Sequence, residues 1–250
     1  SIRTGAVAAA AVLLMGAVPA AADTTVVVSA DGDGGWAFNA DPGFVTPYEF
    51  STDEASIGSG SLYVPPITNT VIGNADKFIG ALPLGAAVAD VEGLSFDYLL
   101  AAGNANQIYM NVYTNLEGST TFYECRFDYV ATSGDASSFS TLAVDGSTVP
   151  TAVGDRGDAF TCPATLGGMP AGSTVSGFRI NLGDTSANDS GSSAYFDNVV
   201  VDLVSGTTTY DFDPAPAVPT SKDDCKNGGF AAFGFPNQGL CIASVVSNKG

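Results

Sequence analysis

In several segments of the sequence, apolar residues alternate with residues that are polar or aromatic. If such a segment forms a strand, its polar and aromatic residues lie together on one side and its apolar residues on the other. Between residues 107 and 114, for example, Tyr109 and Tyr113 alternate with Met110 and Val112. If these strands share a sheet, its outer face gathers ten such residues: Asp97, Gln107, Tyr109, Asn111, Tyr113, Glu124, Arg126, Asp128, Arg179 and Asn181. Aromatic rings stack on the apolar faces of sugar rings, and planar polar groups bond to sugar hydroxyls. The pattern therefore predicts a face that binds glycan.

Two other interpretations of this face stay open. Charged outer faces are the rule in half-buried antiparallel sheets, where cross-strand pairs contribute about 0.2–1 kcal/mol each. In that case the chain is a structural surface or matrix protein without a small ligand. The other interpretation is a glycosidase that uses the two carboxylates of Glu124 and Asp97. Such an enzyme needs carboxyl oxygens about 5–9.5 Å apart in a deep cleft. We adopt the first prediction, a non-catalytic module for glycan or a cell-envelope polymer.

A possible structural calcium site lies in the turn Asp31-Gly-Asp33-Gly-Gly-Trp36. Calcium prefers several carboxylate or carbonyl oxygens on a flexible turn, which glycine permits. The turn is not an EF-hand loop, because Trp36 occupies the position that needs glycine. If the first and last strands are neighbours, Asp197 completes the site with Asp31 and Asp33. The alternative is an acidic turn without an ion, with Asp197 hydrogen-bonded to backbone amides.

Composition narrows the chemistry further. The chain has no histidine, which removes the commonest general base and zinc ligand. Its formal net charge is −18, and residues 23–220 hold 24 acidic and four basic residues. Such acidity opposes nucleic acid and anionic lipid as partners. We therefore expect no nucleic-acid partner and no cofactor beyond the possible calcium.

The elements that must position these residues are predicted to be strands. Alternation is clearest over four segments, residues 94–100, 107–114, 120–129 and 175–182. Glycine-rich and polar turns separate the segments, which is typical of antiparallel sheets packed on a core. About eight to ten short strands in one domain indicate an all-β fold, an antiparallel β-sandwich of the jelly-roll type.

Four parts are predicted along the chain: a signal peptide over residues 1–22, the β-sandwich over 23–212, a proline-rich linker over 213–220 and a disulfide-clipped helical hairpin over 221–250. In the first part Arg3 precedes a short apolar run, which ends in three alanines at positions 20–22. This pattern is typical of a secretory signal peptide, and the run is too short to span a bilayer. We expect a mature chain that begins at Asp23, is not inserted in a membrane, and works outside the cell or at its surface.

Four cysteines, an even number in a chain expected to be exported, predict two disulfides. Three pairings are formally possible, and we favour Cys125–Cys162 and Cys225–Cys241 because the linker separates the two pairs. The second disulfide would join two short helices. Ser221 and Asp224 suggest a capping box for the first helix, and Asn237 a cap for the second. A module of this size depends on its disulfide to fold.

Two stretches resemble known families. The tail contains Asp224-Cys-Lys-Asn-Gly-Gly-Phe230 and Asn237-Gln-Gly-Leu-Cys241. It is similar to a short cysteine-paired tail on bacterial exported proteins, to which no general activity is attached. The larger part, with residues 74–79 and 194–201, resembles uncharacterised secreted bacterial sandwich proteins, and its Tyr-Phe-Asp-Asn-Val ending is similar to the final strand of carbohydrate-binding jelly rolls. That resemblance implies carbohydrate binding and an Asp197 that ligates structural calcium near the first strand.

Overall fold

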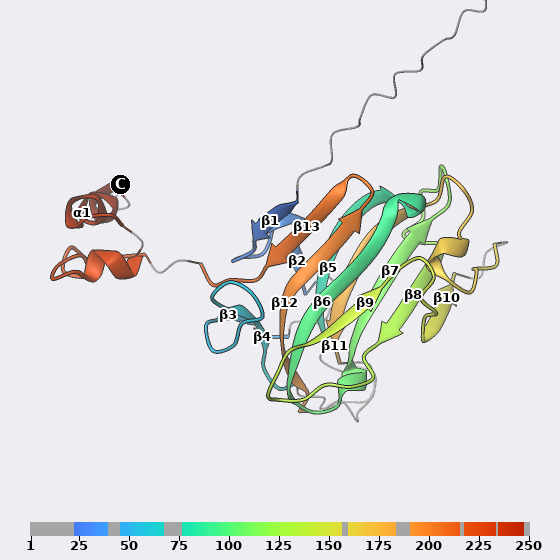
Figure 1. The fold of residues 1–250 in the computed structure, drawn as a ribbon, viewed down its shortest axis with the longest axis horizontal. Coiled ribbons are helices and arrows are strands. Elements are labelled where there is room, and N and C mark those ends of the chain that lie inside the picture. The colour runs from blue at the N-terminus through green and yellow to red at the C-terminus, as the bar shows by residue number, and fades with distance from the viewer. Residues whose placement is uncertain are drawn as a thin grey trace, which may run out of the picture.

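The computed structural model describes residues 23–39, 46–67, 77–156, 160–183, 191–215, 218–233 and 235–247. The predicted signal peptide lies outside these residues. Within them, two β-sheets enclose a common core, and a tail at the carboxyl end carries one α-helix (Figure 1). The predicted fold class is confirmed: an antiparallel β-sandwich of the jelly-roll type, with a small helical appendage closed by a disulfide.

The first sheet has seven strands, with β12 at its centre. One edge of β12 pairs with β6 along its length, and the other edge is divided between β13 and β4. The sheet is completed by β9 outside β6, β3 outside β4, and β1, which runs parallel to β13. The bounds are β1 (Thr24–Val27), β3 (Glu49–Ser51), β4 (Ser61–Val64), β6 (Val91–Ala102), β9 (Ser140–Val144), β12 (Ser193–Leu203) and β13 (Gly206–Asp211).

The second sheet has six strands in the order β10-β8-β7-β11-β5-β2, and all its pairs are antiparallel. The bounds are β2 (Ala37–Phe38), β5 (Phe78–Ala87), β7 (Ile108–Asn115), β8 (Cys125–Val130), β10 (Ala152–Asp155) and β11 (Thr174–Leu182). Directly paired residues of neighbouring strands point to the same side. The register therefore places Asn111 of β7 between Asp128 of β8 and Arg179 of β11, on one face of the sheet.

Alternation along the central strands explains the core. On β7 the side chains of Met110 and Val112 are fully buried, and on β11 those of Phe178 and Ile180 are too. Their neighbours in sequence point outward, as the pattern predicts. Trp36 packs edge-on against the rings of three core residues at centroid distances of 5.1–6.0 Å: Phe178, Tyr210 and Phe212. Both sheets thus contribute to one apolar interior.

The tail has a small cluster of its own, formed by the buried Cys225, Cys241 and Val245. Its helix α1 (Gln238–Ser247) begins after Asn237, whose side-chain oxygen accepts the backbone N–H of Leu240 at 3.0 Å. This hydrogen bond is the cap that the sequence predicts.

The predicted first helix of the tail is wrong. Residues 221–228 form successive turns, and a short 3₁₀ helix follows over Gly229–Phe233. Asn227 and Gly228 adopt positive φ angles of 52° and 88°, and two left-handed residues in succession end any right-handed helix. Ser221 and Asp224 still exchange the hydrogen bonds expected of a capping box.

Both predicted disulfides are present. Cys125–Cys162 joins the start of β8 to the segment that follows β10, and Cys225–Cys241 joins the turns of the tail to α1. None of the helices in the described ranges is long and apolar enough to cross a lipid bilayer.

Candidate functional site

A chain of four polar side chains crosses the outer face of the six-stranded sheet. Asn181 on β11 donates to the side-chain oxygen of Asn111 on β7 at 3.0 Å. Asn111 in turn donates to Asp128 Oδ1 on β8 at 2.7 Å. Arg126 ends the chain, with Nε and Nη2 each 2.7 Å from an oxygen of Asp128. The hydrogen bond to Asp128 is the main reason why the pKa of Arg126 is raised. This polar chain is held rigidly, because each member positions the next.

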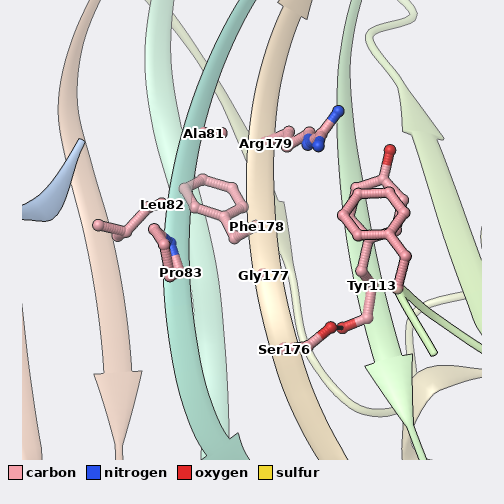
Figure 2. Close-up of a pocket in the computed structure, with 9 residues that line it drawn as sticks. Ala81, Leu82, Pro83, Tyr113, Ser176, Gly177, Phe178 and Arg179 are labelled. Carbon is pink, nitrogen blue, oxygen red and sulfur yellow. Dashed lines mark hydrogen bonds between the residues drawn. The ribbon is translucent and has the colours of Figure 1, made fainter. Parts of the chain in front are cut away.

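Beside the polar chain lies a cluster of rings and guanidinium groups. The rings of Tyr113, Phe122 and Tyr123 pack with centroid distances of 5.0–5.5 Å. The guanidinium of Arg179 lies 4.9 Å from the centroid of Tyr113, and that of Arg156 lies 4.8 Å from that of Tyr123. Figure 2 shows Arg179 extending from β11 toward Tyr113 on β7. A cation over a ring face is attracted by the ring quadrupole, so these contacts help to hold the rings and the guanidinium groups in place.

Glu124 builds the loop that carries Phe122. Its carboxylate accepts the backbone N–H of Leu116 at 3.0 Å and the hydroxyl of Thr121 at 2.9 Å, and it also accepts the hydroxyl of Ser119. Burial of the carboxylate works against ionisation, but these hydrogen bonds lower the pKa of Glu124 overall. The loop over residues 116–124 is therefore closed at its base, and it presents Phe122 with 52% of its surface exposed.

Two open depressions lie next to each other on this face and share Tyr113 as a wall. One, of about 260 Å³, lies over the polar chain and is also lined by Tyr109 and Lys77. The other, of about 170 Å³, has an apolar floor over β5 and β11, and Phe122 lines it. Arg179 and Tyr113 border it, as Figure 2 shows. The face thus offers polar groups on one side of Tyr113 and apolar surface on the other, as a polysaccharide requires.

Gly177 keeps the second depression open. It pairs with Tyr113 on one side and with Pro83 on the other, so a side chain there would stand in the depression. A Cβ built on Gly177 would have the backbone oxygen of Leu82, at 3.7 Å, as its nearest neighbour. The space is therefore real, and it can be filled without a backbone clash.

Seven of the ten residues predicted for the outer face do share it: Tyr109, Asn111, Tyr113, Arg126, Asp128, Arg179 and Asn181. The other three do not. Glu124 lies in the loop before β8, where it accepts hydrogen bonds from that loop. Gln107 ends a 3₁₀ turn (Ala105–Gln107) before β7. Asp97 belongs to β6, which pairs with β9 and β12, so it lies in the other sheet.

Asp97 lies instead in a polar centre on the seven-stranded sheet. Its carboxylate accepts the hydroxyl of Thr141 at 2.6 Å, the amide of Asn198 at 2.9 Å and the hydroxyl of Ser56. Asp97 lies on β6 in one sheet, whereas Glu124 lies in the loop before β8 of the other sheet, and each carboxylate is held by its own partners. The structure therefore gives no support to a glycosidase that pairs these two carboxylates.

The three residues predicted to hold calcium do not form a shared site. Fully buried Asp197 accepts backbone N–H groups of residues 56, 57 and 212 at 2.9–3.1 Å, and burial is the main reason why its pKa is raised. Asp31 accepts the N–H of Phe38 at 2.7 Å, and Asp33 that of Ser29 at 3.0 Å. In the described ranges no three acidic or cysteine side chains are grouped to hold a metal ion. Calcium binding stays a prediction, to be measured as thermal unfolding in calcium and in chelator.

Exposure also differs from the sequence prediction. Tyr113 points outward as predicted but is only 7% exposed, because Phe122 and Arg179 cover it. The exposed ring is that of Phe122, which the alternating pattern placed inside a strand over residues 120–129. That strand begins at Cys125 instead. The Glu117-Gly118 turn with the following serine and threonines is the sequence signal that could have extended the loop to Phe122.

No family model matches the sequence, and no curated protein matches it. Among solved structures, the chain is similar to several carbohydrate-binding modules. One is the family 11 module of the cellulosomal cellulase Lic26A-Cel5E of Clostridium thermocellum, with 14% identity and a TM-score of 0.42 over 68% of this chain and 86% of that one. Another is the CBM22-1 xylan-binding domain of Paenibacillus barcinonensis Xyn10C, with 14% identity and a TM-score of 0.38 over 68% and 86%. The K2 cleaved adhesin domain of Lys-gingipain is similar as well, with 11% identity and a TM-score of 0.36 over 69% and 92%. At this identity the similarity concerns the β-sandwich fold alone.

Proposed function

We propose that the chain is a non-catalytic, extracellular module that binds glycan or a cell-envelope polymer on the outer face of its six-stranded sheet. The observation that carries this proposal is the pair of depressions on either side of Tyr113. They bring exposed aromatic surface and a fixed chain of polar groups together on one face. The two disulfides support a location outside the cytoplasm.

The chemistry of the face suits a polysaccharide. A sugar ring can lie on the exposed part of Phe122, and the next can lie in the other depression, which Tyr109 and Lys77 line. Asp128 is held in place by the hydrogen bond that it accepts from Asn111, so it can bond to a sugar hydroxyl with little loss of side-chain entropy.

The first experiment is affinity electrophoresis of the full chain in gels that contain soluble polysaccharides or solubilised cell-wall polymers. We expect retardation by at least one polymer. Phe122→Ala should weaken that retardation about tenfold by removing the stacking platform. Gly177→Leu should weaken it similarly by filling the second depression.

The matched control is Tyr195→Ala. Tyr195 stacks on Tyr63 at 4.5 Å on the seven-stranded sheet, so this variant removes a half-buried outward ring from the other sheet. It should bind like the parent. If no polymer retards the parent chain, the proposal fails and a structural surface protein without ligand takes its place. If Tyr195→Ala abolishes binding while Phe122→Ala does not, the binding face has been assigned to the wrong sheet.

A further inference from the structure

All the basic residues of the predicted sandwich lie at the outer face of the six-stranded sheet. Between residues 23 and 220 they are Lys77, Arg126, Arg156 and Arg179, against 24 acidic residues. Arg126 and Arg179 lie on β8 and β11, Lys77 directly precedes β5, and Arg156 directly follows β10. All of these strands belong to the same sheet. In a strongly acidic chain, this face is where positive charge is gathered.

Three of these cations stand over aromatic rings. Lys77 Nζ lies 5.0 Å from the ring centroid of Tyr109. The guanidinium of Arg179 lies near both Tyr113 and Phe122, at 4.9 and 5.3 Å, and Arg156 is held in the same manner by Tyr123 and Phe122. A guanidinium carries five N–H donors in a rigid fork, which can bond to a ligand that lies beside the ring.

We infer that the bound glycan is a polyuronate, an acidic polysaccharide whose sugars carry carboxylates; this inference rests on the proposed glycan-binding function. In a uronic acid the carboxylate is attached directly to the sugar ring. A sugar that stacks on Phe122 therefore brings its carboxylate close to Arg179, whose guanidinium is 5.3 Å from the centre of that ring. The planar fork of arginine matches a carboxylate with two parallel hydrogen bonds.

The charge of the whole chain strengthens this selectivity. A polyanion is repelled by the acidic remainder of the surface and attracted at this face, so it approaches in one orientation. Arg126 is already paired with Asp128, so the attraction comes from Lys77, Arg156 and Arg179, and a neutral polysaccharide gains no charge attraction from them. Binding of a polyuronate should accordingly weaken with added salt, because screening reduces attraction between exposed charges.

The test compares polygalacturonate and alginate with their carboxyl-reduced forms, which keep the same linkages without the charge. We expect the full chain to bind at least one polyuronate at least about tenfold more tightly than its reduced form. Sodium chloride at about 0.5 M should remove most of that difference. Dextran sulfate is the control for negative charge alone, because it carries sulfate groups in place of planar carboxylates. It should bind more weakly than the polyuronate.

Arg179→Gln and Arg156→Gln should abolish the discrimination between the acidic and the reduced polymer. Lys222→Gln, which removes one charge from the tail, should leave it unchanged. Equal binding of the acidic and reduced forms, still lost in Phe122→Ala, would overturn the polyuronate inference and leave the glycan-binding proposal standing. Equal or tighter binding of dextran sulfate would overturn the carboxylate assignment. Absence of binding to every polymer would overturn both.

Discussion

Asp211 ends β13 next to two other carboxylates. It is only 7% exposed, and its Oδ1 has no hydrogen-bond partner among the described residues. A Cβ built on Gly58 would stand 2.5 Å from an oxygen of Asp211 and 2.8 Å from one of Asp213, so both carboxylates crowd the same glycine. Burial, followed by the charges of Asp213 and Asp197, raises the pKa of Asp211 to about 6.

This raised pKa predicts that Asp211→Asn stabilises the chain at neutral pH. The folded state holds the Asp211 proton up to about pH 6, whereas the unfolded state releases it near 3.8. The parent therefore loses stability as pH rises through this window, by up to about 3 kcal/mol in total. The variant should be more stable than the parent in urea unfolding at about pH 8, with the gain gone at about pH 3.5. A gain of equal size at both pH values would show that ionisation is not its cause.

Tyr113 and Phe122, two aromatic residues of the candidate site, should respond differently to truncation. Tyr113→Ala should destabilise the chain by about 2–4 kcal/mol, since the ring is covered, and Met110→Ala by about 2–5 kcal/mol through a core cavity. Phe122→Ala should change stability by less than about 1 kcal/mol, because half of its ring is exposed. Urea unfolding of the three variants checks this. A Phe122→Ala variant as unstable as Met110→Ala would mean that the loop, and not the ring alone, has been lost.

At the residue scale, alternation predicted which side of a strand each side chain takes, but not how much of it stays exposed. Tyr113 shows the difference: its direction follows from β7, whereas its cover comes from Phe122 and Arg179, which are brought in by a loop and another strand. Asp197 was predicted as a calcium ligand or as an acceptor of backbone amides. The backbone N–H groups that donate to Asp197 belong to residues 56, 57 and 212. No local sequence pattern indicates that these three residues lie close to Asp197 in the fold.

Among the elements, the loop over residues 116–124 is held in large part by the carboxylate of Glu124, which accepts three of its hydrogen bonds. Glu124→Gln replaces an ionised acceptor of three hydrogen bonds with a neutral amide, so the loop should open and Phe122 should lose its position. We expect faster amide exchange over residues 116–124 and weaker glycan binding, with a nearly unchanged unfolding midpoint. The hydrogen bonds that hold the loop also lower the pKa of Glu124, so the loop should stay closed at neutral pH and loosen once the pH falls through that lowered pKa. Unchanged exchange in the variant would contradict this role.

The central strands were predictable because each combines a clear alternation with turns at both ends. Sheet membership was not, because it depends on pairing between distant segments. The strand that carries Asp97 has a pattern like that of β7, yet it pairs with β9 and β12, so Asp97 faces the opposite side of the sandwich. In place of the first helix predicted for the tail, residues 221–226 form turns, and the positive φ angles of Asn227 and Gly228 only prevent these turns from continuing as a right-handed helix.

For the whole molecule, we predict that the tail and the sandwich unfold independently. Their buried residues form separate clusters, and the cluster of the tail is built on Cys225–Cys241. Replacing both cysteines with serine should abolish amide protection in α1, because so small a cluster lacks the core to fold alone. The thermal midpoint of the sandwich should stay within about 1 °C of the parent. A shift of several degrees would show that the two parts are coupled.

The short strands at the ends of both sheets have a consequence for behaviour at high concentration. An unpaired edge exposes a row of N–H and C=O groups on which another chain can add a strand, which is how ordered aggregates begin. In the six-stranded sheet the edge strands are β10, with four residues, and β2, with two. In the seven-stranded sheet the longest strands, β6 and β12, are each paired on both sides. Beyond its two pairs with β2, the edge of β5 carries Pro83, which has no N–H to donate. Concentrated solutions should therefore stay clear of fibrils for as long as the sandwich stays folded.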